Sequence, residues 1–291
     1  MTIDNPFRPP DAVLQTAPTW QAGAMIPDGR SVPASHGWRW ARDSVLMVAA
    51  TPLTWAAITL VFFILAVAIS LLPIVSLLWN VALPIVLGGL MIGCHAAAQG
   101  QPPEVRHLFA GFEAPRLQPL AMVGVLYLAA TVIMVMCIVL VGVGGGVGVA
   151  MLVGPEQMEA QPLLVGSGIA ILVLVAMGLG MALSMTIWFA PALVALHSLQ
   201  ALDAMRMSLR ASLRNVLPFL VYGLVLLGIV AVAACAGGGF VLALGTVLRN
   251  GWLGFPEALV GAAVTGVLAG MALAPSAWCA MYASYRDVFV G

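Results

Sequence analysis

The sequence predicts an all-α integral membrane protein with six transmembrane helices arranged as three tandem hairpins, each preceded by a cytoplasmic amphipathic interfacial helix. Three observations predict this fold. The chain is 62% hydrophobic and 8% charged, whereas a soluble domain carries about 25% charged residues. Its apolar runs are as long as a bilayer requires. Its eleven basic residues are all arginines, and they gather between alternate apolar runs.

Residues 1–36 are predicted to be a disordered cytoplasmic tail. They contain six prolines and almost no hydrophobic periodicity, a composition typical of chain that cannot build a core. A short recognition motif within this tail is the alternative to a plain solvated segment. No apolar h-region lies near Met1, so we expect no cleaved signal peptide. The remainder, 37–291, is predicted to form a single transmembrane domain.

The first amphipathic segment is expected at residues 37–51. Trp38, Ala41 and Val45 share one helical face there, and Arg39 and Arg42 fall off it. Aromatic and arginine side chains together are typical of a membrane–water boundary. A helix that binds a soluble partner is the weaker alternative, because an apolar run follows at once.

The lengths of the uncharged runs set the number of crossings. The sixty residues between Asp43 and Glu104 contain no Asp, Glu, Lys or Arg. About 20 helical residues cross a hydrocarbon core, so this run holds two spans joined by a tight turn near Pro73. The same reasoning along the chain gives six expected spans, at about 53–72, 75–98, 119–148, 163–197, 218–248 and 256–285.

Two further amphipathic segments precede the third and fifth spans. In residues 105–112 we expect Val105, Leu108, Phe109 and Phe112 to share a face, with Arg106 and His107 off it. In residues 199–217 we expect an apolar arc on one side of a helix, with arginines along its border. The arc consists of Leu202, Met205, Leu209, Leu213 and Val216, and the border of Arg206, Arg210 and Arg214. Arginine can bury its stem in such an arc and hold its guanidinium at the phosphates.

These two segments supply the first candidate site, a contact for an anionic lipid or ligand. Its members are Arg206, Arg210, Arg214, Arg106 and His107. The alternative is that the arginines only anchor the topology.

The distribution of arginine predicts the orientation. Ten arginines fall in the N-terminal tail, before spans 3 and 5, or at the C-terminus, and only Arg249 falls on the opposite side. By the positive-inside rule both termini are cytoplasmic.

The second candidate site is a set of polar residues and glycines within the spans. Its members are Asn80, Gly145, Gly238, His95 and His197. The glycine cluster 142–148 is not expected to remain a lipid-facing helix, because glycine costs about 1 kcal/mol per residue relative to alanine. Such clusters can mark a transporter's binding site, or can serve helix packing and helix ends. The histidines lie near the inner ends of spans 2 and 4, where with His107 they could meet or be incidental.

The sequence contains no feature typical of an enzyme. Motifs for a serine nucleophile, a zinc protease or a phosphate loop are absent, and the predicted spans contain no charged residue apart from Glu257 in the first turn of the sixth. Each of the four cysteines sits alone in an apolar run, which predicts neither a metal site nor a redox pair. We therefore expect no catalytic residue, metal or cofactor, and no nucleic-acid partner.

Two functional interpretations follow. The first is a non-enzymatic membrane protein that organises lipids, anionic lipids included, or a membrane protein partner at the cytoplasmic face. The alternative is a permease or channel for a small neutral or amphiphilic solute, lined by the glycine clusters and Asn80.

The run PIVLGGLMIGCHAAAQGQPPEVRHLFAGF, with GWRW before the first span, resembles a bacterial family of uncharacterised six-span inner-membrane proteins. It is similar, more distantly, to the membrane domain attached to some glycerophosphodiester phosphodiesterases. The close match covers roughly residues 37–112. The family's usual basic residue and glutamate near Gly100 are replaced here by Gln99 and Gln101, and no phosphodiesterase domain is present. The resemblance thus implies the fold and a bacterial inner-membrane location, and it implies no catalytic activity.

Overall fold

The computed structural model describes residues 25–71, 73–154, 162–247 and 255–290 of the 291-residue chain. Within these ranges the chain is helical and has no strand, which confirms the all-α prediction for the described residues. The elements are α1 (His36–Ala50), α2 (Pro52–Ser70), α3 (Pro73–Ala98), the 3-10 helix η1 (Val105–Phe112), α4 (Leu117–Val153), α6 (Pro162–Trp188), α7 (Ala190–His197), α8 (Ala201–Arg214), α9 (Val216–Val247) and α10 (Phe255–Phe289).

Five stretches of the described chain are long and apolar enough to cross a membrane. They are Pro52–Ser70, Leu78–Ala98, Leu117–Gly148, Val165–His197 and Val216–Ala233. These stretches fall on the first five expected spans. The sixth expected span, 256–285, falls in α10, which is not among the five; much of the first half of α10 lies outside the residues whose side chains are described.

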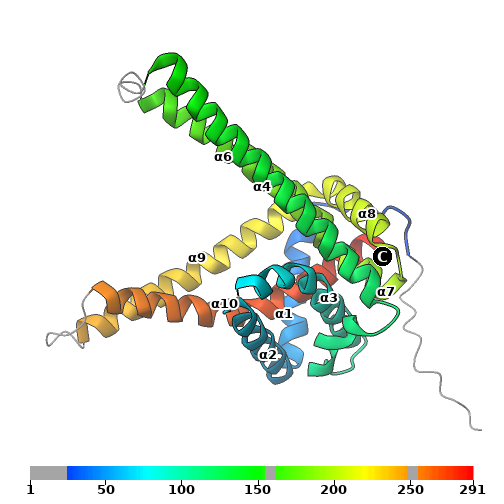
Figure 1. Ribbon diagram of the computed structural model, residues 1–291. Helices are drawn as coiled ribbons and strands as arrows, with labels where there is room; N and C mark the ends of the chain where they lie inside the picture. Colours follow the sequence, from blue (N-terminus) through cyan, green and yellow to red (C-terminus); the bar gives the residue numbers. More distant parts are fainter. Residues whose placement is uncertain (1–24, 72, 155–161, 248–254, 291) are drawn as a thin grey trace, which may run out of the picture.

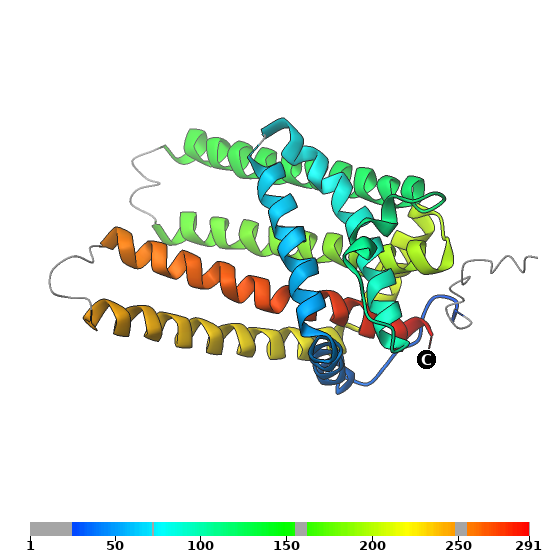
Figure 2. The same cartoon turned by 90° about the horizontal axis from the view of Figure 1, so that it is seen from below.

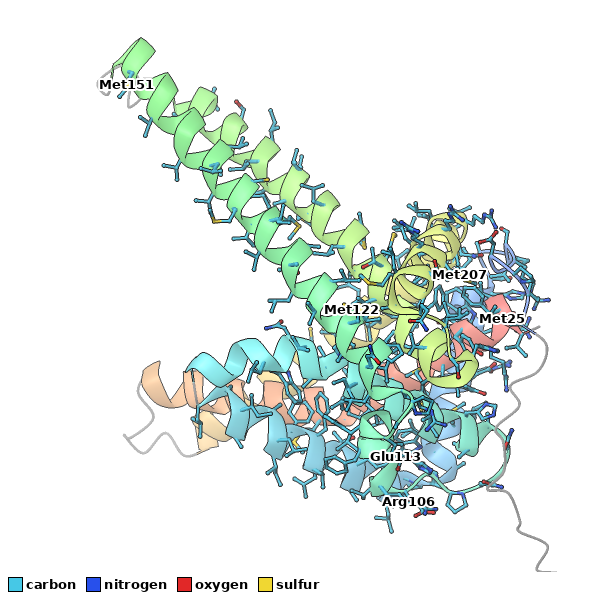
Figure 3. The ribbon with its side chains drawn as sticks, turned by 45° about the vertical axis from the view of Figure 1, so that its right-hand side comes forward. Met25, Arg106, Glu113, Met122, Met151 and Met207 are labelled. Carbon is cyan, nitrogen blue, oxygen red and sulfur yellow. The ribbon has the colours of Figure 1, made fainter. Side chains whose placement is uncertain are left out.

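The long helices extend in two pairs from one end of the molecule. We call this end, where α1, α7, α8 and the C-terminal part of α10 pack together, the base. α4 packs along α6, and α9 packs along α10, while the two pairs diverge from each other (Figure 1). Figure 2 shows the base at one end of the molecule, where α8, the C-terminal end of α10 and the N-terminal segment lie together. In Figure 3, Met25 and Met207 lie in this base and Met151 lies at the far tip of α4.

Burial separates the base from the extended pairs. The largest fully buried side chains, Trp40, Trp55, Phe189, Tyr285 and Phe289 among them, belong to the base. By contrast, the apolar window of α6 has none of its residues buried, and that of α4 has 11%. Apolar surface of this extent is stable only in contact with lipid or another protein.

Gly89 of α3 and Gly111 of η1 let the two helices lie against each other. A Cβ on Gly111 would fall 1.9 Å from the backbone oxygen of Ile85, and one on Gly89 would fall 2.3 Å from that of His107. The backbones of α3 and η1 are therefore in direct contact. The sequence instead predicted residues 105–112 to be an interfacial helix at the membrane surface. Because η1 is a 3-10 helix, with three residues per turn, it buries Leu108 and exposes Phe109 and Phe112, so the single apolar face predicted there is wrong.

The apolar face predicted for α1 is mostly turned away from the protein, as a face that meets a membrane surface would be. Trp38 and Val45 are exposed, whereas Trp40 is buried with its ring against Phe219, 5.3 Å between centroids. Gly37 lies against the start of α9, where a Cβ would fall 2.1 Å from the oxygen of Pro218. α1 thus packs through its glycine and its second tryptophan.

The glycine cluster 142–148 remains part of an exposed helix, contrary to the sequence prediction that it would not. α4 continues to Val153, and nothing lies within 4 Å of a Cβ built on Gly144, Gly145, Gly146 or Gly148. The reason is that a backbone in lipid has no water to bind, so the helix keeps its internal hydrogen bonds despite the glycine cost.

Residues 25–35, which the sequence assigns to the disordered tail, are held in place. We call them the N-terminal strap. The amides of Ile26 and Arg30 donate to the backbone oxygens of Phe289 and Val288, at 2.7 and 2.9 Å. Residues 1–24 of the predicted tail lie outside the described residues.

Candidate functional site

A break in the fourth expected span positions α8. The helix is interrupted at Phe189, just before Pro191, which cannot donate a helical hydrogen bond. The hydroxyl of Ser208 bridges the break, since it accepts from the amide of Phe189 at 2.9 Å and donates to the oxygen of Met185 at 2.7 Å. Ser208 is fully buried, so this bridge fixes α8 against the end of α6.

The face of α8 that packs against the protein is made of small residues and one methionine. These are Ala201, Ala204, Met205, Ser208, Ala211 and Ser212. Of the predicted apolar arc, Leu202 and Leu213 are instead exposed, at 48% and 56%. Alanine and serine thus fill the side of α8 that packs against the protein, and Leu202 and Leu213 form an exposed row on its outer side.

The arginines of α8 lie beside this exposed row. Arg206, Arg210 and Arg214 are all exposed, on successive turns next to the leucines. Asp28 of the strap reaches two of them: its carboxylate lies 3.6 Å from the Arg210 guanidinium, and its backbone oxygen accepts from Arg214 at 3.3 Å. Within the described residues, Arg206 has no acidic partner. We call Leu202, Leu213 and these three arginines the α8 surface.

Arg106 and His107, the other predicted members of this site, lie apart from the α8 surface. Arg106 and Glu113 are both on the η1 side of the base in Figure 3. The guanidinium of Arg106 is paired with Glu104 at 2.8 Å, and His107 is buried, its Nδ1 accepting from the amide of Glu104 at 2.9 Å. Burial lowers the pKa of His107, as does the Arg106 charge, although Glu104 and Glu113 raise it. His107 therefore closes the start of η1 as a neutral acceptor.

The two histidines predicted near the inner ends of spans 2 and 4 meet a common helix. Nδ1 of His95 is 2.8 Å from the hydroxyl of Tyr282, and Nε2 of His197 is hydrogen-bonded to the hydroxyl of Tyr285. The two tyrosine rings are 5.9 Å apart on α10. His95 and His197 are thus connected through Tyr282 and Tyr285, and His107 is not part of this group.

The other intramembrane candidates are scattered. Gly145 lies in a groove of about 580 Å³ between α4 and α6, whose lining also includes Gly142, Ser167 and Gly168. Asn80 is partly buried on α3 and does not line this groove. Gly238 lies within α9, and its surroundings fall outside the described residues.

Asp287, which sequence reasoning missed, holds the base together. Its carboxylate accepts from Trp40 at 2.8 Å, from His36 at 2.7 Å and from Arg30 at 3.0 Å. Burial raises the pKa of Asp287, but the hydrogen bonds from Trp40, His36 and Arg30 outweigh it, so the pKa lies below its ordinary value. A lone acid in the last turn of a long apolar helix was the available sequence signal.

Asn215 performs a similar role at the junction of α8 and α9. Its side-chain oxygen accepts from the amide of Val32 at 2.8 Å, and its nitrogen donates to the oxygens of Arg30 and Ala211. Asn215 is fully buried. The strap is therefore tied to both α9 and α10.

Two of the four cysteines approach each other. The sulfurs of Cys94 and Cys279 are 3.8 Å apart between α3 and α10, and both thiols are buried. Over the described part of the chain, no group of three or more His, Cys, Asp or Glu side chains is placed to hold a metal ion.

Comparison with known proteins gives one informative similarity. The chain is 27% identical, over 266 residues, to a protein of Burkholderia thailandensis described as a probable inner membrane protein, covering 89% of this chain and 92% of that one. No family model and no solved structure matches the chain. The similarity and the apolar helices together indicate a helical inner-membrane protein. The more distant resemblance to the phosphodiesterase-linked membrane domain stays a prediction.

Proposed function

We propose that this chain is a non-enzymatic, multi-pass inner-membrane protein that gathers anionic lipids at the cytoplasmic face, with the α8 surface as its contact. In this proposal the chain crosses the membrane six times, as three hairpins, with both termini in the cytoplasm. The α8 surface and the pairing of the two chain ends support it.

The pairing of the chain ends supports an even number of crossings. The strap is hydrogen-bonded to Phe289 and Val288 at the end of α10, so both lie on the same side of the membrane. Five candidate spans alone would separate them, whereas counting α10 as the sixth brings them together. The arginine count then assigns this side to the cytoplasm.

The observation that carries the proposed function is the outward order of side chains on α8. Alanine and serine face the protein, leucines lie free beside them, and arginines follow. A helix at a membrane surface needs this order, with apolar side chains toward the acyl chains and guanidinium groups at the phosphates. An arginine near an anionic leaflet contributes about 1 kcal/mol, so three contribute about 3 kcal/mol, before Asp28 offsets part of it.

The test compares two triple variants of the full chain. Arg206, Arg210 and Arg214 are changed to glutamine in one, and in the control Arg39, Arg42 and Arg106 are changed, so that both lose the same charge. Each protein is purified in a neutral detergent, and its bound lipids are counted by native mass spectrometry. We expect the α8 variant to lose most of its phosphatidylglycerol while the control keeps it. Equal retention in both variants, or equal loss, would contradict the proposal.

A membrane protein partner is judged in the same purification. A protein that co-purifies with the control and not with the α8 variant would assign the α8 surface to a partner instead of lipid. That outcome would replace the lipid proposal.

The groove between α4 and α6 favours a second candidate, a permease for a small neutral or amphiphilic solute. Nothing lies within 4 Å of a Cβ on Gly145, so a leucine there fills the groove without displacing a neighbour. Glycerol uptake into proteoliposomes should then fall with Gly145→Leu. Uptake no faster than in protein-free vesicles would exclude this candidate for glycerol-sized solutes.

A further inference from the structure

A small cavity opens where α3 and α10 end, separate from the α8 surface. Its volume is about 180 Å³, and His95, Gln99, Tyr282, Tyr285 and Arg286 line it. We call it the α3–α10 cavity. A space of this size holds a small ligand, since one water needs only about 10–15 Å³ measured in the same way.

The hydrogen bonds around His95 leave a donor available in the cavity. The amide nitrogen of Gln99, which can only donate, lies 3.0 Å from Nε2 of His95, so that ring nitrogen is an acceptor. In neutral His95 the proton is then on Nδ1, which donates to the hydroxyl oxygen of Tyr282. The hydroxyl proton of Tyr282 is left for another acceptor.

The charge at the cavity is positive. Arg286 is exposed in the last turn of α10, and within the described chain no carboxylate lies within ion-pair distance of it. The neighbouring acid, Asp287, is engaged by Trp40, His36 and Arg30, and it does not line the cavity. Among the described residues the lining therefore contains no carboxylate, and it presents a guanidinium, a hydroxyl and an amide as donors.

The helix ends that meet here would by themselves favour a cation. Their carbonyls are, however, largely used. The oxygen of Ala96 in α3 accepts from the amides of Gln99 and Gln101, and those of Val288 and Phe289 in α10 accept from the amides of Arg30 and Ile26. The side-chain donors, not the helix dipoles, thus determine which ligand fits.

We propose that the α3–α10 cavity binds a phosphate group, held by the Arg286 guanidinium and the Tyr282 hydroxyl. Arginine suits phosphate because its planar fork gives two parallel charge-assisted hydrogen bonds. The Gln99 amide, just beyond the end of α3, adds a donor from outside α10, and donors from more than one element suit a tetrahedral anion better than a flat carboxylate. The phosphate comes from a lipid headgroup or from a soluble phosphate, and the same chemistry recognises both.

The test uses the full-length protein in a neutral detergent, with the three α8 arginines changed to glutamine so that lipid at that surface does not interfere. One arm measures binding of radiolabelled inorganic phosphate by equilibrium dialysis, with acetate as competitor. The other measures binding of short-chain phosphatidylglycerol by native mass spectrometry. Arg286→Gln and Tyr282→Phe are compared with Arg42→Gln, an exposed arginine outside the cavity.

We expect one bound phosphate group per chain. Arg286→Gln should raise its dissociation constant about tenfold or more, because a charge-assisted pair is lost. Tyr282→Phe should raise it several-fold, and Arg42→Gln should leave it unchanged. Binding of phosphatidylglycerol alone identifies a headgroup as the source, and binding of inorganic phosphate identifies a soluble one.

Three results would overturn the proposal. They are the absence of saturable binding in both arms, full competition by acetate at equal concentration, and an Arg286→Gln protein that binds as tightly as its parent. Because Arg286 is exposed, its substitution does not disturb the core, and an unchanged thermal midpoint confirms that the variant is folded.

Discussion

Replacing Asp287 with asparagine should release the N-terminal strap from the base. Asp287 accepts hydrogen bonds from Trp40, His36 and Arg30, and its side chain is only 17% exposed. Trp40 and His36 share the Oδ2 oxygen, and Arg30 donates to Oδ1. Asparagine keeps one acceptor oxygen, so either Arg30 meets an amide NH2 group while Trp40 and His36 keep only an uncharged acceptor, or Trp40 and His36 both lose their acceptor.

The magnitude follows from these contacts. A hydrogen bond to a charged group contributes about 1.5–3 kcal/mol, whereas the Arg30 pair contributes about 0.5 kcal/mol or less because that side chain is 44% exposed. The expected loss is about 2 kcal/mol, which corresponds to roughly a 30-fold increase in the open fraction of the strap.

Hydrogen exchange measures this opening directly. The amides of Ile26, Arg30 and Val32 donate to Phe289, Val288 and Asn215, so their exchange reports whether the strap is docked. Exchange of the peptide spanning the strap should accelerate about 30-fold in Asp287→Asn. Asp43→Asn is the matched control, because Asp43 is paired with its neighbour Arg42 and, within the described residues, makes no ion pair to the strap. Equal protection in both variants would refute the role given to Asp287.

The same docking should depend on pH in a defined direction. The pKa of Asp287 is lower in the folded protein than its ordinary value of 3.8. A carboxyl of this kind contributes full stability above its unfolded pKa and loses it as the pH falls through the folded pKa. The Asp287 contribution should therefore persist from neutral pH down to about 4. Loss of strap protection at a higher pH in the parent but not in Asp287→Asn would contradict this.

The other predictions concern packing at the base. Ser208→Ala should lower stability by about 1–3 kcal/mol, since the amide of Phe189 loses its acceptor; an unchanged thermal midpoint in detergent would count against the bridge. Asn215→Leu should cost about 2–4 kcal/mol and expose the strap to exchange, because buried backbone groups lose their partners; protection equal to that of the parent would contradict this. Gly111→Ala should reduce the yield of folded protein sharply, because its Cβ would lie 1.9 Å from a backbone oxygen, while Gly145→Ala, in open space, should leave the yield unchanged; equal yields would refute the contact.

Helix boundaries were the part of the fold that the sequence predicted best. Uncharged length and proline position placed the start of α3 near Pro73 and that of α9 near Pro218, within two residues of the structure. These features act locally, since bilayer thickness sets the length of a span and proline cannot continue a helix.

Contacts between distant segments were not predictable from local patterns. The leucine row of α8 was recognised, but the small residues opposite it, which pack on the protein, carry little hydrophobic signal. The partners of His95 and His197 lie 187 and 88 residues further along the chain, and no spacing rule joins them. Gly89 and Gly111 carry no local signal of the close backbone contact that they make, because this contact depends on tertiary packing.

The orientation of the chain tests the account most directly, because the α8 surface meets anionic cytoplasmic lipid only if both termini are inside. A reporter that fluoresces only in the cytoplasm is fused after Gly291 and, separately, inserted at Glu159. We predict fluorescence at Gly291 and none at Glu159. Fluorescence at Glu159, or a dark reporter at Gly291, would contradict six crossings with both ends in the cytoplasm.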